Sequence, residues 1–183
     1  MELAAEVPFK SIRAYPDVIE YRFYTALAHA AVSDTCAPEL RDAHIGGLRQ
    51  HHSEIKNRCS RNRANFAARI ALLAAEIARV ERRALEAEQH YEEAIQLARD
   101  DGFVQIEAVA AERAARFYAA RNIRTVSHAY LTDARDCYLR WGAVAKARQL
   151  EVENPHLSSP YSISGLPGGS DVPWHQLDIN ALF

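Results

Sequence analysis

Residues 64–102 read ANFAARIALLAAEIARVERRALEAEQHYEEAIQLARDDG, and residues 104–142 read VQIEAVAAERAARFYAARNIRTVSHAYLTDARDCYLRWG. The two stretches align without a gap at a spacing of 40 residues, and each ends on a glycine, Gly102 or Gly142. Alanine and arginine are common in both, and these side chains lose little conformational freedom in a helix. A self-similarity of this length in a helix-favouring sequence predicts a repeated pair of antiparallel helices.

Small residues recur at matched positions of the two stretches, where the helices of a pair would cross. They are Ala71, Ala74, Ala75 and Ala94 in the first stretch and Ala111, Ala114, Ala115 and Ala134 in the second. The copies differ at Ser127, which stands where the first stretch has Ala87. Small side chains let two helices approach closely, so the pattern predicts an all-α fold of stacked helix pairs. This short right-handed solenoid resembles the tetratricopeptide (TPR) pattern, lengthened from about 34 to about 40 residues per repeat.

Proline and glycine set the limits of the helices. No proline lies between Pro38 and Pro155, and no glycine lies between Gly47 and Gly102. Apolar residues recur three and four positions apart, and no run alternates apolar and polar residues, so we expect helices and no sheet. The expected helices cover about 17–33, 38 to beyond 55, 64 to a break near 82, 84–99, 103–120, 124–140 and 143–153. We expect the glycine pair at 46 and 47 to kink or split the second of these helices.

The same pattern predicts which side chains are buried. In the helix from residue 64, Arg69, Glu76, Arg79 and Arg83 should lie away from the apolar face. Leu85 should lie on the inner face of the next helix. Gly102 is the expected left-handed residue after a helix C-terminus.

Three regions follow from these patterns. Residues 1–16 form an irregular lead-in, and 17–153 form the helical repeat domain. Residues 154–183 form a flexible linker, rich in proline, glycine and serine, that ends in a short apolar segment from Trp174 to Phe183. We expect this segment to dock in a groove of its own chain or to mediate a homodimer.

The composition of the chain argues against several classes of protein. The 183 residues carry a net charge of −2, which argues against a dedicated nucleic-acid binder. No apolar run approaches the roughly 20 residues of a membrane-spanning helix, and no signal peptide opens the chain. The three cysteines form no disulfide or metal-binding spacing. We therefore expect a cytoplasmic protein without membrane contact.

Several strings carry a family resemblance. They are YRFYTALA at 21–28, HYEEAI at 90–95, GFV at 102–104, AYLTDARDCYLRWGAVAKARQL at 129–150 and QLDI at 176–179. They resemble the helical-repeat region of very large bacterial signalling proteins. Those proteins combine a serine/threonine kinase-like domain, an AAA-type ATPase domain, this repeat region, a GAF domain and a histidine kinase. Two turn positions depart from the family, because Arg82 and Asn122 stand where it usually has glycine.

The repeat and the resemblance together imply a non-enzymatic interaction module of a signalling protein. A helix pair cannot bury its apolar side alone, and stacked pairs supply a concave surface rather than chemistry. The partner would be a protein or peptide segment, including neighbouring signalling domains, and we expect no cofactor. The candidate interaction residues, limited to those that prove exposed, are Tyr118, Tyr130, Tyr138, Trp141, Arg116, Arg135 and Trp174.

Two other hypotheses stay open. A helical-bundle metal protein or enzyme would use His44, His51, His52 and Glu54, since imidazole and carboxylate are competent ligands. A nucleic-acid binder would use the basic run from Lys56 to Arg69.

Overall fold

The computed structural model describes residues 15–59 and 64–157, and within them the protein is all-α, with seven α-helices and no strand. The helices are α1 (Tyr15–Val32), α2 (Pro38–Arg58), α3 (Ala67–Val80), α4 (Ala84–Asp100), α5 (Val104–Ala120), α6 (Arg124–Trp141) and α7 (Val144–Glu153). Short 3₁₀ turns, η2 (Ala64–Phe66) and η3 (Pro155–Leu157), precede α3 and follow α7. The expected all-α fold and the expected helices are confirmed for this part of the chain, with ends that differ by a few residues.

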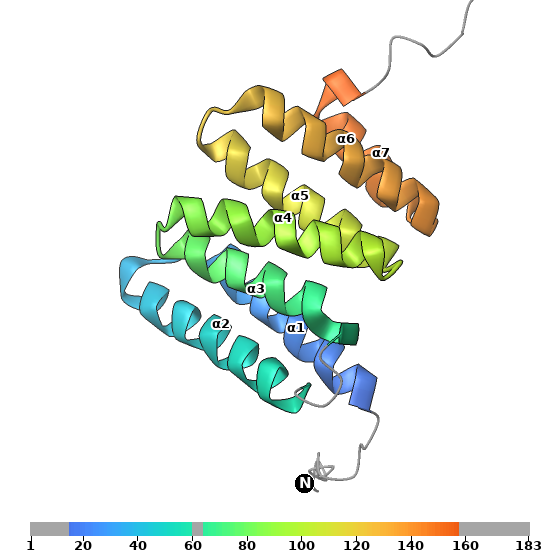
Figure 1. The fold of residues 1–183 in the computed structure, drawn as a ribbon. Helices are drawn as coiled ribbons and strands as arrows, with labels where there is room; N and C mark the ends of the chain where they lie inside the picture. Colours follow the sequence, from blue (N-terminus) through green and yellow to red (C-terminus); the bar gives the residue numbers. More distant parts are fainter. Residues whose placement is uncertain (1–14, 60–63, 158–183) are drawn as a thin grey trace, which may run out of the picture.

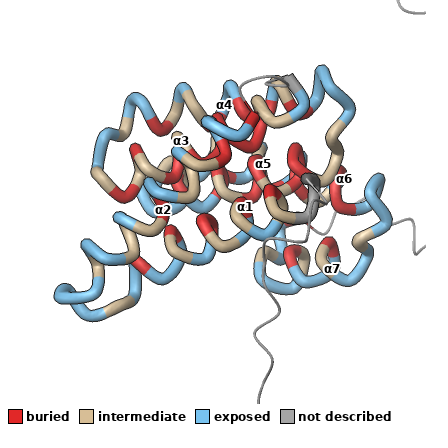
Figure 2. The backbone as a smooth tube through the Cα atoms, turned by 90° about the horizontal axis from the view of Figure 1, so that it is seen from below, coloured by how far each residue is buried: buried red, intermediate tan, exposed pale blue. Residues whose placement is uncertain are grey.

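The helices stack in sequence order (Figure 1). The pairs α1 with α2, α3 with α4 and α5 with α6 pack most extensively. Neighbouring pairs meet through α2 with α3 and α4 with α5, and α1 also packs against α3. Most buried residues lie between helices, while the turns are largely exposed (Figure 2). The core therefore continues from one pair to the next.

Four turns between consecutive helices share one backbone geometry. A residue in the left-handed region occupies each turn: Arg82 (φ 63°), Gly102 (φ 72°), Asn122 (φ 60°) and Gly142 (φ 87°). The amide of the next residue donates to the carbonyl oxygen five positions back in every case. These bonds are Arg83 to Ala78 (2.8 Å), Phe103 to Ala98 (2.8 Å), Ile123 to Tyr118 (3.0 Å) and Ala143 to Tyr138 (2.9 Å). This is the Schellman motif, and the left-handed residues follow each other at intervals of 20.

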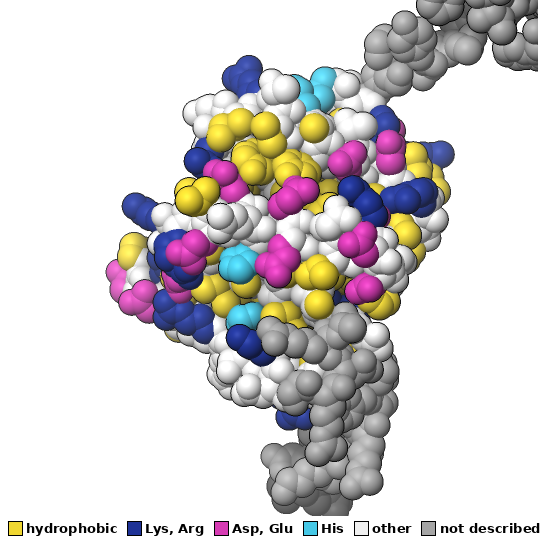
Figure 3. Space-filling view, in the orientation of Figure 1, with side chains coloured by type: hydrophobic (Ala, Val, Ile, Leu, Met, Phe, Trp, Pro, Cys, Tyr) yellow, Lys and Arg dark blue, Asp and Glu magenta, His cyan; other side chains and the backbone are white. Residues whose placement is uncertain are grey.

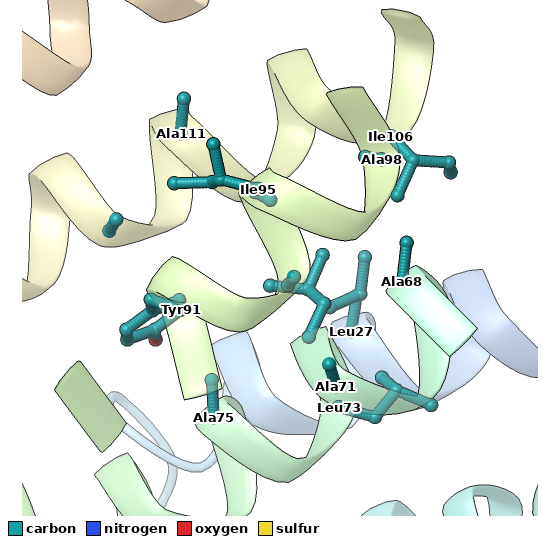
Figure 4. Close-up of a cluster of buried hydrophobic side chains, with 14 of the residues drawn as sticks. Leu27, Ala68, Ala71, Leu73, Ala75, Tyr91, Ile95, Ala98, Ile106 and Ala111 are labelled. Carbon is teal, nitrogen blue, oxygen red and sulfur yellow. The ribbon is translucent and has the colours of Figure 1, made fainter. Parts of the chain in front are cut away.

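Small residues lie where α3 crosses α4 and where α5 crosses α6. Ala75 and Ala87 are fully buried, and so is Ala115, while Ser127 is 3% exposed. The Ser127 hydroxyl donates to the Ala115 carbonyl oxygen at 2.9 Å, which satisfies the polar atom that replaces Ala87. Figure 4 shows further alanines and Tyr91 in the core that α3, α4 and α5 share.

The burial predicted from the sequence is wrong for three side chains. Arg69 and Glu76 were expected in solvent but are 6% and 0% exposed, whereas Leu85, expected inside, is 68% exposed. Because α3 packs against both α1 and α4, its buried surface is wider than one helical stripe.

The predicted split of α2 at its glycine pair is wrong, because α2 continues through both residues. A Cβ at Gly47 would lie 2.8 Å from the imidazole of His29 on α1. Gly47 thus leaves room for a close contact between α1 and α2. The expected lead-in, apart from its last two residues, and the expected linker and apolar tail beyond residue 157 lie outside the described residues.

A pair of alanine substitutions tests the turn geometry. A Cβ at Gly46 or at Gly102 would meet no atom within 4 Å, but only Gly102 has a positive φ. We expect Gly102→Ala to lower the free energy of unfolding by about 1 kcal/mol, because an L-residue is strained there. Gly46→Ala, in a helix interior, should raise it by about 0.5–1 kcal/mol. Urea denaturation of both variants measures this, and equal stabilisation would contradict a left-handed turn.

Candidate binding site

A cavity of about 560 Å³ opens where the C-terminal ends of α1, α3 and α5 come together. Five arginines line it, together with two carboxylates and an apolar wall that includes Phe117; we call it the arginine cavity. The arginines are Arg79, Arg82, Arg113, Arg116 and Arg121, and the carboxylates are Asp34 and Glu76. Basic side chains therefore outnumber acidic ones around this cavity.

One wall of the cavity is a fixed ion network. The Arg79 guanidinium donates to Asp34 at 2.8 and 2.9 Å, to Glu76 at 2.9 Å and to the Ala30 carbonyl oxygen at 3.0 Å. Glu76 also accepts a bond of 2.8 Å from the buried Tyr91 hydroxyl. Although burial opposes its charge, Glu76 and Asp34 raise the pKa of Arg79. The charge of Arg79 is therefore matched within the protein.

The other arginines differ in how far they are neutralised. Arg116 pairs with Glu112, and Arg121 pairs with Glu88. Arg113 donates only to the Leu27 carbonyl oxygen, at 3.4 Å. The Arg82 side chain is exposed, and its guanidinium has no hydrogen-bond or ion-pair partner within the described part of the chain. Two guanidinium groups, on Arg82 and Arg113, therefore lack a carboxylate partner among the described residues.

A second network beside the cavity centres on the buried Glu112. Its carboxylate accepts bonds from the Tyr138 hydroxyl at 2.6 Å and the Lys146 ammonium at 3.0 Å, besides its pairing with Arg116. Burial raises the pKa of Glu112, but the bonds from Tyr138 and Lys146 and the charges of Arg116 and Lys146 together outweigh it, and the net shift is downward. The network ties α5 to α6 and α7.

The aromatic candidates from the sequence do not form one site. Tyr118 and Tyr130 stack with their ring centroids 5.5 Å apart, and the Tyr130 hydroxyl donates to Glu92 at 2.7 Å. Tyr138 is only 4% exposed, so it offers no contact surface. Trp141, at the end of α6, is 49% exposed. Trp174 lies outside the described residues.

Of the two arginine candidates, one reaches the cavity. Arg116 lines it, whereas Arg135 donates to the Leu157 carbonyl oxygen at 2.6 Å and holds η3 in place. The other arginines of the cavity, Arg79, Arg82, Arg113 and Arg121, were not predicted as site residues. Only Arg82 had a signal in the sequence, because it stands at a turn position where the related turns at Gly102 and Gly142 have glycine.

The histidine candidates separate onto different sides of α2. His29, on α1, was missed by the sequence; its Nδ1 lies 3.0 Å from Nδ1 of His44, and its ring stacks on that of His51. His52 instead lies near α3, where the backbone of Ile70 interacts with its ring. Within residues 15–59 and 64–157, no group of three or more His, Cys, Asp or Glu side chains has an arrangement that could hold a metal ion.

The basic run is partly occupied by contacts inside the protein. Arg69 is buried; it pairs with Glu20 and lies 5.4 Å from the centroid of the Phe103 ring. A phosphate backbone cannot reach this guanidinium without opening the fold. Arg61 and Arg63 lie outside the described residues. On the face in Figure 3, acidic and basic side chains are interspersed among hydrophobic ones, and no single charge predominates.

Comparison with known proteins gives one informative similarity. Over 61 residues, the chain is 43% identical to hybrid signal transduction histidine kinase G of Dictyostelium discoideum. The match covers 33% of this chain, which spans 2% of that protein's length. No family model matches the sequence, and no solved structure matches it. The similarity links the chain to part of a signal-transduction protein.

None of the described helices, α1 to α7, combines the length and the apolar character that crossing a membrane requires.

Removal of one hydroxyl tests the Glu112 network. Tyr138→Phe should lower the free energy of unfolding by about 1.5–3 kcal/mol, the range for hydrogen bonds to charged groups. Tyr130→Phe is the matched control: it removes a bond to Glu92 that is exposed to solvent, and should cost less than about 1 kcal/mol. Chemical denaturation at pH 7 compares them, and equal losses would contradict a special role for the buried bond.

The lowered pKa of His51 predicts that the stability of the protein depends on pH. Burial lowers the pKa of His51, Arg22 and His29 lower it further, and Glu54 opposes them. The folded state then favours the neutral ring, so this contribution to stability is present above the unfolded pKa of about 6.5 and is lost as the pH falls below it. We expect His51→Gln to flatten the fall in thermal midpoint between pH 7 and pH 5. An unchanged slope would show that His51 does not contribute.

Proposed function

We propose that this chain is a non-catalytic protein-binding module of a signal-transduction protein. The observation that carries the proposal is the arginine cavity, formed where the first helices of three successive pairs end. A concave, partly apolar site with a few convergent polar groups is the common form of a binding site. The partner is a protein or peptide segment, including a neighbouring domain of the same signalling protein.

The proposed architecture is a TPR-like right-handed solenoid. It is supported by the four Schellman turns at intervals of 20 residues and by the small residues at the helix crossings. In such arrays each unit contacts mainly its neighbours, and helices of successive units together form an extended binding surface. The three first helices that line the arginine cavity fit this arrangement.

The signalling context is supported by the similarity to part of a histidine kinase. We propose that the chain acts within such a protein in the cytoplasm, as a scaffold. Catalysis would reside in other domains, because the networks around Arg79 and Glu112 are explained as internal pairs that hold helices together.

Selection from a displayed library of random peptides tests the binding function. The immobilised full chain should enrich peptides that later bind it in solution with micromolar affinity. The same preparation should turn over neither ATP nor a phosphorylated model substrate. Two results would overturn the proposal: no enrichment above the level on a bare support, or robust turnover.

A further inference from the structure

We propose that the arginine cavity binds an acidic peptide segment, whose carboxylates pair with Arg82 and Arg113 while an apolar neighbour packs against the exposed Ala31 and Ala120. This inference rests on the proposed function and adds the chemistry of the partner. Its basis is that Arg82 and Arg113 line one cavity without a carboxylate partner in the described part of the chain.

The charges around the cavity favour an anion. Five arginines face two carboxylates there, and both carboxylates already bond Arg79. Arg116 and Arg121 are paired with glutamates outside the lining, Glu112 and Glu88. A ligand carboxylate would accept charge-assisted hydrogen bonds from guanidinium groups that would give up few interactions within the protein.

The walls of the cavity favour a peptide over a small inorganic anion. Besides the guanidinium groups, the lining includes Phe117 and the side chains of Ala31, Ala84 and Ala120. The guanidinium of Arg121 lies over the Phe117 ring, 5.0 Å from its centroid. A volume of about 560 Å³ has room for a few side chains of a segment that combines acidic and apolar residues.

The backbone conformation of Arg82 costs free energy, and a ligand-binding role of its side chain would explain why an arginine stands there. It has a φ of 63°, whereas glycine stands in the equivalent position of the turns at Gly102 and Gly142. A left-handed conformation costs a residue with a side chain about 1–2 kcal/mol. Such strain clusters at ligand sites. An arginine at this turn therefore makes the fold less stable than a glycine would, but it places a positive charge at the cavity.

The test uses the full chain and fluorescein-labelled peptides of twelve residues. The probe contains four glutamates and four leucines; in its controls, glutamine or lysine replaces every glutamate. We expect fluorescence anisotropy to show binding of the glutamate peptide, at least tenfold weaker binding of the controls, and weaker binding of the glutamate peptide at higher salt. A further arm of the experiment measures the binding of a single-stranded RNA with the same net charge as the glutamate peptide.

Variants connect this binding to the cavity. Arg82→Gln and Arg113→Gln should each weaken binding of the glutamate peptide about tenfold. Arg148→Gln is the matched control, because the Arg148 side chain is exposed, does not line the cavity and has no partner within the described residues. It should change binding less than twofold.

A second pair of variants separates binding from stability. Arg82→Gly should raise the thermal midpoint and weaken binding. Asn122→Gly relieves a smaller strain of the same kind at a turn outside the arginine cavity, so it should raise the midpoint slightly and leave binding unchanged. Because both variants are expected to be more stable than the parent chain, misfolding does not obscure the result.

Several results would overturn the inference. They are equal binding of the glutamate and glutamine peptides, tighter binding of RNA than of the glutamate peptide, or binding unaffected by Arg82→Gly. If library-selected peptides bind the parent chain and the Arg82 and Arg113 variants equally, the proposed function stands and this inference fails. If no peptide binds at all, both fail.

Discussion

The left-handed residue that closes each helix from α3 to α6 is the constraint on which the structure depends. It reverses the chain within three residues, and the Schellman bonds across it satisfy carbonyl groups that a helix end would leave free. Because these residues recur at intervals of 20, consecutive helices have nearly equal lengths: 17 residues in α4 and α5, and 18 in α6. Equal lengths bring the same positions of successive helices together, and alanines at those positions let the backbones approach.

The cavity follows from the same regularity. When every second helix ends on the same side of the stack, the ends of α1, α3 and α5 become neighbours although they are far apart in sequence. Long arginine side chains on α3 and α5 and in the turns that follow them then converge, and only some of them meet a carboxylate. Near-neutral net charge hides this local excess, since acidic residues elsewhere on the chain balance it.

Much of the fold could be predicted from the sequence. The period of 40 residues, the helices from α3 to α7, the buried alanines and the left-handed Gly102 all follow from local patterns. Burial was misjudged where packing involves more than one partner: Glu76 is buried because α3 contacts several helices, and Leu85 is exposed because its side of α4 faces solvent. The cavity could not be predicted, since it needs three helix ends brought together and a count of which arginines are already paired. The histidine cluster shows the same limit, because His29 joins His44 and His51 only after α1 packs on α2.

Amide hydrogen exchange tests the repeated turn most directly. In each turn an amide that donates the five-residue bond lies close in sequence to an amide that has no backbone acceptor among the described residues. The amides of Phe103 and Ala143, after glycine, and of Arg83 and Ile123, after a non-glycine residue, donate the five-residue bonds. The amides of Leu85 and Thr125, two residues after Arg83 and Ile123, have no backbone acceptor among the described residues. The account predicts slow exchange at all four bonded amides and fast exchange at Leu85 and Thr125. Exchange at Arg83 and Ile123 as fast as at Leu85 and Thr125 would contradict it.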